Sequence, residues 1–93
     1  MLAEIREFRI CDGYRIEIRF ADGVQGTVDL SDLVGRGVFE GLRNPAEFAR
    51  AQLDEFGALS WPGGADLAPD AMHEALARDG FWKPVFAKTP LPA

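Results

Sequence analysis

The chain has little cysteine, little histidine and no long hydrophobic run. Its 93 residues include one cysteine, Cys11, and one histidine, His73. One cysteine excludes an internal disulfide and a zinc site built from several thiolates, and it is typical of a reducing compartment. No apolar stretch approaches the roughly 20 residues that span a bilayer. Glu4, Arg6 and Glu7 interrupt the apolar pattern of the N-terminus, which is unlike a signal peptide. The sequence therefore predicts a cytoplasmic protein.

Basic residues are also in the minority. Ten Lys and Arg stand against 15 Asp and Glu, which gives a net charge of −5. Phosphate contacts need a basic face, so the composition disfavours nucleic acid and membrane surfaces and favours a basic or neutral protein partner. A chain of this length builds one modest core. We expect one α+β domain over residues 1–80 and a proline-containing tail over 81–93, packed back or partly flexible.

The clearest strand pattern lies between positions 14 and 20, where apolar and charged residues alternate. The apolar set is Tyr14, Ile16, Ile18 and Phe20, and the charged set is Arg15, Glu17 and Arg19. This period of two predicts a strand with one face in the core. We expect the charged face to be solvated, because interspersed charge keeps a one-sided sheet soluble. A covering layer from a partner or another subunit is the alternative.

An Asp-Gly pair follows this strand, and the two faces of the sheet decide how the chain turns there. A two-residue loop at Asp22-Gly23 would place apolar side chains opposite polar ones. A three-residue loop over 21–23 instead pairs Phe20 with Val24 and keeps apolar residues together. Glycine then stands third in the loop, where a G1 bulge needs a left-handed residue.

The Asp-Gly pair before the strand gives a second loop by the same rule. A three-residue loop over 11–13 pairs Ile10 with Tyr14 and Phe8 with Ile16, again with glycine third. Ile5 breaks the alternation, which indicates a bulge or a frayed strand start near Arg6. The sequence therefore predicts an antiparallel meander over about 3–10, 14–20 and 24–29.

Helix signals occur at two places. Asn44-Pro45-Ala46-Glu47 supplies an N-cap, a proline at the first position and an acid at the third, and it predicts a helix over about 45–50. Pro69 and Gly80 bracket a second helix over about 69–79 that ends at a left-handed glycine. A short hairpin is expected near 52–61. The predicted fold is α+β: the meander and this hairpin packed with two short helices.

Segment 61–70 reads Trp-Pro-Gly-Gly-Ala-Asp-Leu-Ala-Pro-Asp, and shorter motifs precede it at 14–23, 28–30, 37–39 and 42–45. In these motifs the chain resembles, over about residues 3–75, the bacterial family catalogued as domain of unknown function 2442. The resemblance implies a small α+β domain and no established activity. Some members carry a helix-turn-helix domain, which we do not expect here because the stretch after Gly80 is unsuited to two helices. Others are encoded beside small proteins in toxin–antitoxin-like pairs.

Three residues depart from the family pattern. Gly63 stands where asparagine is usual, an exchange that keeps a left-handed turn accessible. Ala68 replaces a serine or aspartate N-cap, which costs about 1 kcal/mol at the helix end unless Asp66 or water supplies the cap. His73 replaces a common tyrosine, so any role of a phenol there does not carry over to this chain.

Acidic residues and the lone histidine gather around the start of the second predicted helix. Asp70 lies one turn from His73 and Glu74, and Asp66 precedes the helix, so an acid/base pair or metal ligands could share one face. We favour the simpler interpretation, in which Asp70 complements the helix N-terminus and the others are solvated. We predict no catalytic residue, no metal site and no cofactor. The predicted binding residues are Trp61, Asp66, Asp70 and Trp82.

The tail carries aromatic residues that allow two interpretations. Phe81, Trp82 and Phe86 are interleaved with Lys83 and followed by further proline. They form either a docking segment or the last part of the chain's own core, and we favour the core because a small domain needs apolar area.

These observations predict a protein-binding or regulatory adaptor, with the antidote-like member of a toxin–antitoxin-like pair as one form of it. The expected partner is another small protein, and a second copy of the chain is a further candidate. The alternative function is a small metal- or acid/base-dependent enzyme that uses Asp66, Asp70 and His73.

Overall fold

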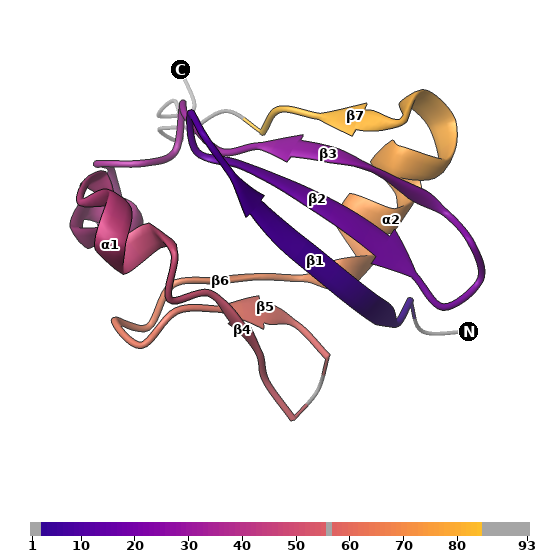
Figure 1. The fold of residues 1–93 in the computed structure, drawn as a ribbon, viewed down its shortest axis with the longest axis horizontal. Coiled ribbons are helices and arrows are strands. Elements are labelled where there is room, and N and C mark those ends of the chain that lie inside the picture. Colours follow the sequence, from indigo (N-terminus) through magenta and orange to yellow (C-terminus); the bar gives the residue numbers. More distant parts are fainter. Residues whose placement is uncertain (1–2, 56, 85–93) are drawn as a thin grey trace, which may run out of the picture.

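Figure 1 shows the computed structural model of the chain, which describes residues 3–55 and 57–84. Three longer strands come first, and short helices and short strands follow. The elements are β1 (Ile5–Cys11), β2 (Arg15–Phe20), β3 (Gln25–Asp29), the 3-10 helix η1 (Gly37–Arg43), α1 (Pro45–Phe48), β4 (Gln52–Leu53), β5 (Leu59–Ser60), β6 (Asp66–Leu67), α2 (Pro69–Asp79) and β7 (Phe81–Trp82). This content confirms the predicted α+β fold.

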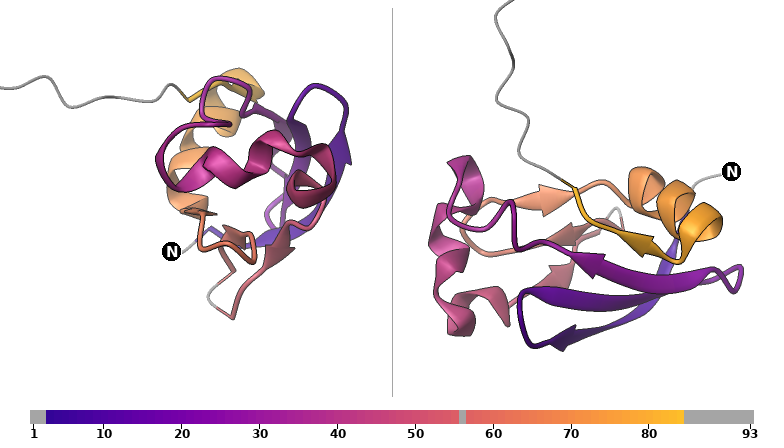
Figure 2. Two further views of the ribbon diagram at one scale, coloured as in Figure 1. Left: turned by 90° about the vertical axis from the view of Figure 1, so that its left-hand side faces the viewer. Right: turned by 90° about the horizontal axis from the view of Figure 1, so that it is seen from above.

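The strands form two sheets. The larger has the order β1-β2-β3-β7, in which the first three strands are antiparallel and β7 runs parallel to β3. The smaller sheet has the order β4-β5-β6. Helix α2 and the small sheet lie on the same side of the large sheet, while η1 and α1 close one end (Figures 1 and 2). The opposite face of the large sheet has no covering layer among the described residues.

The period of two in β2 places its apolar residues in the core, as predicted. Ile16, Ile18 and Phe20 are buried, and the charged residues between them are exposed. On the neighbouring strands the core side holds Phe8 and Ile10 of β1, which are half-buried, and Val28 of β3, which is buried. The core also takes side chains from every later layer: Leu30, Leu33, Leu42, Phe48, Leu59, Trp61, Ala65, Leu67, Met72 and Leu76.

The loop between β2 and β3 has the predicted register. Ile18 pairs with Gly26 and Ile16 with Val28, and the Phe20 N–H donates to the Val24 carbonyl. Gly23 has a φ of 94°, in the left-handed region that a third loop position requires. The predicted bulge near Arg6 is also confirmed, since the β1–β2 register shifts between Ile5 and Glu7.

The register predicted between β1 and β2 is wrong by one loop position. Ile10 pairs with Ile16 and Phe8 with Ile18, so the loop is Asp12-Gly13-Tyr14 and Tyr14 takes the left-handed conformation with a φ of 61°. Tertiary contacts explain this choice: the Tyr14 ring meets Phe48 edge-on at 5.1 Å, and its hydroxyl donates to the Arg43 carbonyl. These contacts outweigh the local cost of a left-handed tyrosine, about 1–2 kcal/mol.

The shorter elements confirm some predictions and add elements that were not predicted. The first helix begins at Pro45 with the expected Asn44 cap, but it ends at Phe48 and is shorter than predicted. The hairpin near 52–61 is present as β4 and β5. Strands β6 and β7 and the 3-10 helix η1 were not predicted. Phe56, Phe86 and the tail from residue 85 lie outside the described residues.

Helix α2 spans Pro69–Asp79, as predicted, and its C-terminus touches β3. Gly80 is left-handed at φ 71° and donates its N–H to the Leu76 carbonyl, while its own carbonyl accepts from the Thr27 N–H at 3.1 Å. A Cβ on Gly26 would lie 2.3 Å from the Gly80 oxygen. Glycine is therefore required at position 26 for the helix to approach the sheet. No helix in the described part of the chain has the length and apolar character to cross a membrane.

We expect Gly26→Ala to lower the free energy of unfolding by about 1–3 kcal/mol, because the new methyl group would push the backbone at Gly80 away from β3. Urea unfolding measures this change. The matched control is Gly63→Ala, where the same methyl group meets no atom within 4 Å. Equal stability of the two variants would contradict the close approach.

Candidate functional site

The predicted binding residue Trp61 lies in the core. Only 3% of the Trp61 surface is exposed to solvent. The indole N–H donates to the Phe48 carbonyl at 2.8 Å, and the indole ring stacks on the Phe48 ring with centroids 5.9 Å apart. Phe39 meets the same indole edge-on. A partner has no access to this ring in the folded chain, so Trp61 positions α1 against the small sheet.

The acidic residues and His73 do not converge on a common centre. Asp66 is exposed on β6, and Asp70 accepts a 3.4 Å hydrogen bond from the Ala3 N–H. His73 instead reaches the β2–β3 loop, where its Nε2 lies 2.7 Å from Asp22 Oδ2. Within residues 3–55 and 57–84 no three His, Cys, Asp or Glu side chains gather as a metal site would need.

The contact between His73 and Asp22 ties α2 to the meander. The His73 ring also meets Phe20 edge-on, with centroids 4.8 Å apart. The Asp22 carboxylate accepts from the Val24 N–H, and this bond, followed by the one from His73, lowers the pKa of Asp22 below its ordinary value of 3.8. His73 therefore links α2 to the end of β2 and the loop that follows it.

Trp82 and Phe81 lie on opposite faces of β7. Trp82 pairs with Val28 and is half-buried against the core, whereas Phe81 pairs with Thr27 and is 46% exposed. Phe81 is the large apolar residue that the described part of the chain leaves most open to solvent. A binding role was predicted for Trp82, but Phe81 beside it carries the exposed ring.

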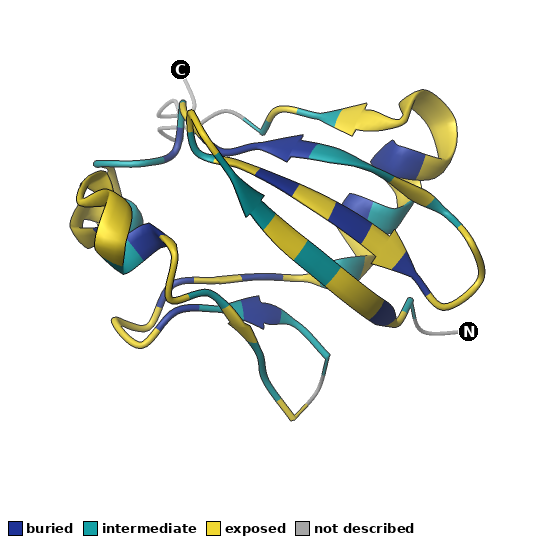
Figure 3. Cartoon of the chain, in the orientation of Figure 1, coloured by how far each residue is buried: buried dark blue, intermediate teal, exposed yellow. Residues whose placement is uncertain are grey.

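The uncovered side of the large sheet, which we call the outer face, carries the exposed residues that alternate with buried ones along β2 (Figure 3). It is formed by Glu7, Arg9 and Cys11 of β1, Arg15, Glu17 and Arg19 of β2, Gln25, Thr27 and Asp29 of β3, and Phe81 of β7. Opposite charges stand directly across from each other on neighbouring strands. The ion pairs are Glu7 with Arg19, Arg9 with Glu17 and Arg15 with Asp29.

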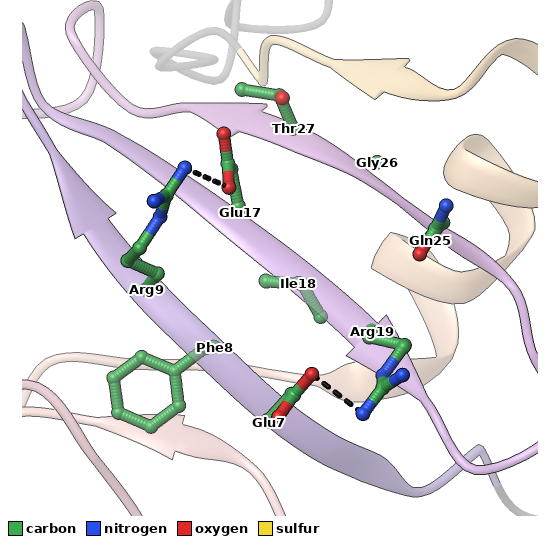
Figure 4. A pocket seen from close by; sticks show the side chains of 9 residues that line it. All are labelled: Glu7, Phe8, Arg9, Glu17, Ile18, Arg19, Gln25, Gly26 and Thr27. Atoms are coloured by element: carbon green, nitrogen blue, oxygen red, sulfur yellow. Dashed lines mark hydrogen bonds and ion pairs between the residues drawn. The ribbon is translucent and has the colours of Figure 1, made fainter.

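Two of these ion pairs border a hollow on the outer face. Figure 4 shows Glu7 with Arg19 at one end and Arg9 with Glu17 at the other, and the strand backbone at Ile18 lies between them. The hollow measures about 700 Å³ and opens to solvent. It contains charge of both signs and no histidine or thiol, so it offers contacts for a partner's polar side chains more readily than groups for covalent chemistry.

The third ion pair is more buried. Asp29 is 7% exposed, and burial by itself would raise the pKa of its carboxyl group. Hydrogen bonds from Ser31 and the positive charges of Lys83 and Arg15 outweigh burial, and the pKa of Asp29 is lowered. Asp29 therefore stays ionised at neutral pH and holds the end of β3 beside β2.

The sequence identified the charged face from β2 but missed the ladder of pairs across the strands. The ion pairs between β1 and β2 depend on the strand register, which was predicted with the loop one position too early. Glu7 meets Arg19 and Arg9 meets Glu17 only when Cys11 pairs with Arg15. Phe81 was recognised as aromatic, but its direction depends on the parallel pairing of β7 with β3.

Comparison with known proteins gives a family and nothing closer. A family model described as "Protein of unknown function (DUF2442)" matches residues 5–77. Neither the curated proteins nor the solved structures contain a match to the chain.

We expect Asp22→Ala to lower the free energy of unfolding at pH 7, and we expect this difference from the wild type to shrink as the pH falls below 3.8. A carboxylate whose pKa is lowered by folding contributes stability above its unfolded pKa and loses it as the pH falls through the folded value. Urea unfolding over a pH series measures the difference.

The control for this prediction is Asp22→Asn, which keeps an oxygen that can accept from the Val24 N–H. It should cost less than the alanine variant at pH 7. An alanine effect that stays constant as the solution is acidified would contradict a contribution from the ionised carboxylate.

We expect Trp61→Phe to lower the free energy of unfolding by about 1–3 kcal/mol, because it leaves the buried Phe48 carbonyl without its indole donor. The matched control is Trp82→Phe, which makes the same substitution at a half-buried ring and should lower the free energy of unfolding by less. Chemical denaturation compares the two variants. Equal losses would contradict the special position of Trp61.

Proposed function

We propose a function from the structure, because the chain belongs to the DUF2442 family of proteins of unknown function and this membership assigns no activity. The chain acts as a protein-binding module, and a partner protein sits on the outer face of its large sheet. The observation that carries this proposal is that α2 and the small sheet lie on the other side of the large sheet, and η1 and α1 lie at one end (Figure 2).

The charges of the outer face suit a protein surface. Three arginines, Arg9, Arg15 and Arg19, stand against three acids of the same face. A phosphate backbone would need an excess of positive charge, and this face is balanced. Exposed ion pairs are weak and can be exchanged for pairs with a partner at little net cost. The face can therefore accept a protein that presents charge of both signs.

Phe81 supplies an apolar anchor at the border of this face. It is 46% exposed and pairs with Thr27, which also lines the hollow. Aromatic residues contribute a large part of the binding energy where they are covered by a partner. A ring beside a polar surface fits the usual arrangement of a small apolar contact within a larger polar one.

The partner we propose is another small protein with a neutral or basic surface, since the chain carries a net charge of −5. One form of this proposal makes the chain the antidote-like member of a toxin–antitoxin-like pair. The enzyme alternative gains no support from the geometry, because His73 contacts Asp22, Asp70 accepts from the Ala3 N–H, and Asp66 is exposed on β6.

We expect Glu17→Arg and Phe81→Ala to reduce partner capture about tenfold or more, because each changes the outer face at a central or anchoring position. The tagged wild-type chain and its variants are used to purify partners from a native lysate, and the bound proteins are quantified by mass spectrometry. Glu74→Arg, which makes the same charge change on the exposed side of α2, is the matched control.

A partner that is retained by the wild type and the control and lost by both outer-face variants supports the proposal. Thermal unfolding of each variant confirms that the fold is intact. A partner that binds all variants equally, or no partner at all, would overturn it.

A further inference from the structure

The edge of the large sheet at β1 has no neighbour among the described residues. The strand spans seven residues, and β2 is the strand that pairs with it. At the other edge, β7 has two residues. An unpaired strand edge presents backbone N–H and C=O groups that can bind another extended segment. The edge of β1 is therefore the longer of the two sheet edges at which an added strand could pair.

The hydrogen-bond pattern shows which residues of β1 present these groups. The Leu30 N–H donates to the Tyr14 carbonyl and the Phe20 N–H to the Val24 carbonyl, so even-numbered residues of β2 face β3. Backbone direction alternates along an antiparallel strand. Odd-numbered residues of β2 therefore face β1, where they pair with the odd-numbered residues of that strand. Phe8 and Ile10 direct their backbone groups away from β2, toward the open edge.

The side chains at this edge prescribe the chemistry of a segment that pairs with it. Phe8 and Ile10 are half-buried on the core side, so apolar residues opposite them would extend the apolar layer. Glu7 and Arg9 are exposed on the outer face. Opposite charges directly across from each other stabilise antiparallel strands, and like charges destabilise them.

We infer that the edge of β1 binds an extended segment of the partner protein by antiparallel strand addition, and that this segment reads acid, apolar, basic from its N-terminus. The acid stands opposite Arg9, the apolar residue opposite Phe8 and the basic residue opposite Glu7. The inference rests on the proposed function and names where the partner's contact begins. The charge rows of the outer face, such as Glu17 with Arg9, then continue with alternating sign onto the added strand.

The same edge limits other pairings. A slip of one residue would put a charged side chain opposite Phe8 and reverse the faces of the added strand. A slip of two residues would bring like charges together at Glu7 or Arg9. The bulge between Ile5 and Glu7 ends the regular edge on one side, as bulges do where a sheet edge must not pair at random.

The test uses two fluorescein-labelled heptapeptides and the full chain. The first reads Thr-Ile-Glu-Phe-Arg-Ile-Thr, and the second exchanges its glutamate and arginine. We expect the first peptide to bind the wild type about tenfold more tightly than the second, because the exchange replaces two attractive cross-strand pairs by two repulsive ones. Fluorescence anisotropy measures both dissociation constants.

A matched variant reverses the charges of the edge without breaking the pairs inside the chain. The E7R/R9E/E17R/R19E variant keeps the net charge and keeps an opposite charge across each of the two ion pairs, Glu7 with Arg19 and Arg9 with Glu17. We expect its preference to reverse, so that it binds the second peptide more tightly. Urea unfolding checks that its stability is close to that of the wild type.

A second readout follows the backbone directly. Binding of the first peptide should slow amide hydrogen exchange at Phe8 and Ile10, whose N–H groups gain partners, and leave Arg9, which already faces β2, unchanged. A structural disturbance of β1 would change all three amides together.

Each other outcome overturns the inference. Equal binding of the two peptides, or no binding, removes the acid-apolar-basic recognition, and a wild-type preference for the second peptide removes the antiparallel direction. Glu7-Phe8-Arg9 itself reads acid, apolar, basic, so a second copy of the chain could pair with this edge in the same way. Self-association in sedimentation equilibrium that Glu7→Arg or Arg9→Glu abolishes would therefore assign the edge to a second copy and overturn the partner segment. In all these cases partner capture that depends on Glu17 and Phe81 would still stand, so failure here is distinct from failure of the proposed function.

Discussion

The contact between the C-terminus of α2 and β3 is the one on which the rest of the arrangement depends. At Gly26 the strand has no side chain, and the Gly80 carbonyl comes close enough to accept a hydrogen bond from the Thr27 N–H. The left-handed turn at Gly80 then brings the chain back beside β3 as β7. One close approach between two glycines therefore places the helix, adds the fourth strand and sets the direction of Phe81.

This contact also divides the molecule into a packed side and an open side. Because α2 and the small sheet share one face of the large sheet (Figure 2), the apolar residues of the meander pack on that face and the charged residues stand on the outer face. The parallel pairing of β7 puts Phe81 on the outer face and Trp82 on the core side. The proposed binding surface is thus a consequence of how the core is covered, since no separate element builds it.

The sequence could predict the parts of the fold that rest on local chemistry. Alternation fixed the faces of β2, the third loop position required Gly23, and Pro69 with Gly80 bounded α2, all of which the structure confirms. Tertiary contacts decided the remainder. Tyr14 adopts a left-handed conformation because Phe48 and the Arg43 carbonyl hold its side chain. These partners lie about 30 residues away, and no sequence pattern near Tyr14 predicts them. Two-residue strands such as β6 and β7 carry too few residues for a period to be read.

The candidate site follows the same division between local and distant information. The segment around Trp61 is the most distinctive in the sequence, yet its indole is used inside the core, which shows that a specific motif can serve folding. The charge pairs of the outer face come from residues far less distinctive, and they matter because strand register sets them opposite one another. An exposed pair contributes little to stability. A regular array of such pairs nevertheless defines which charges a neighbouring strand can present, so its physical effect is on the choice of partner more than on the stability of the fold.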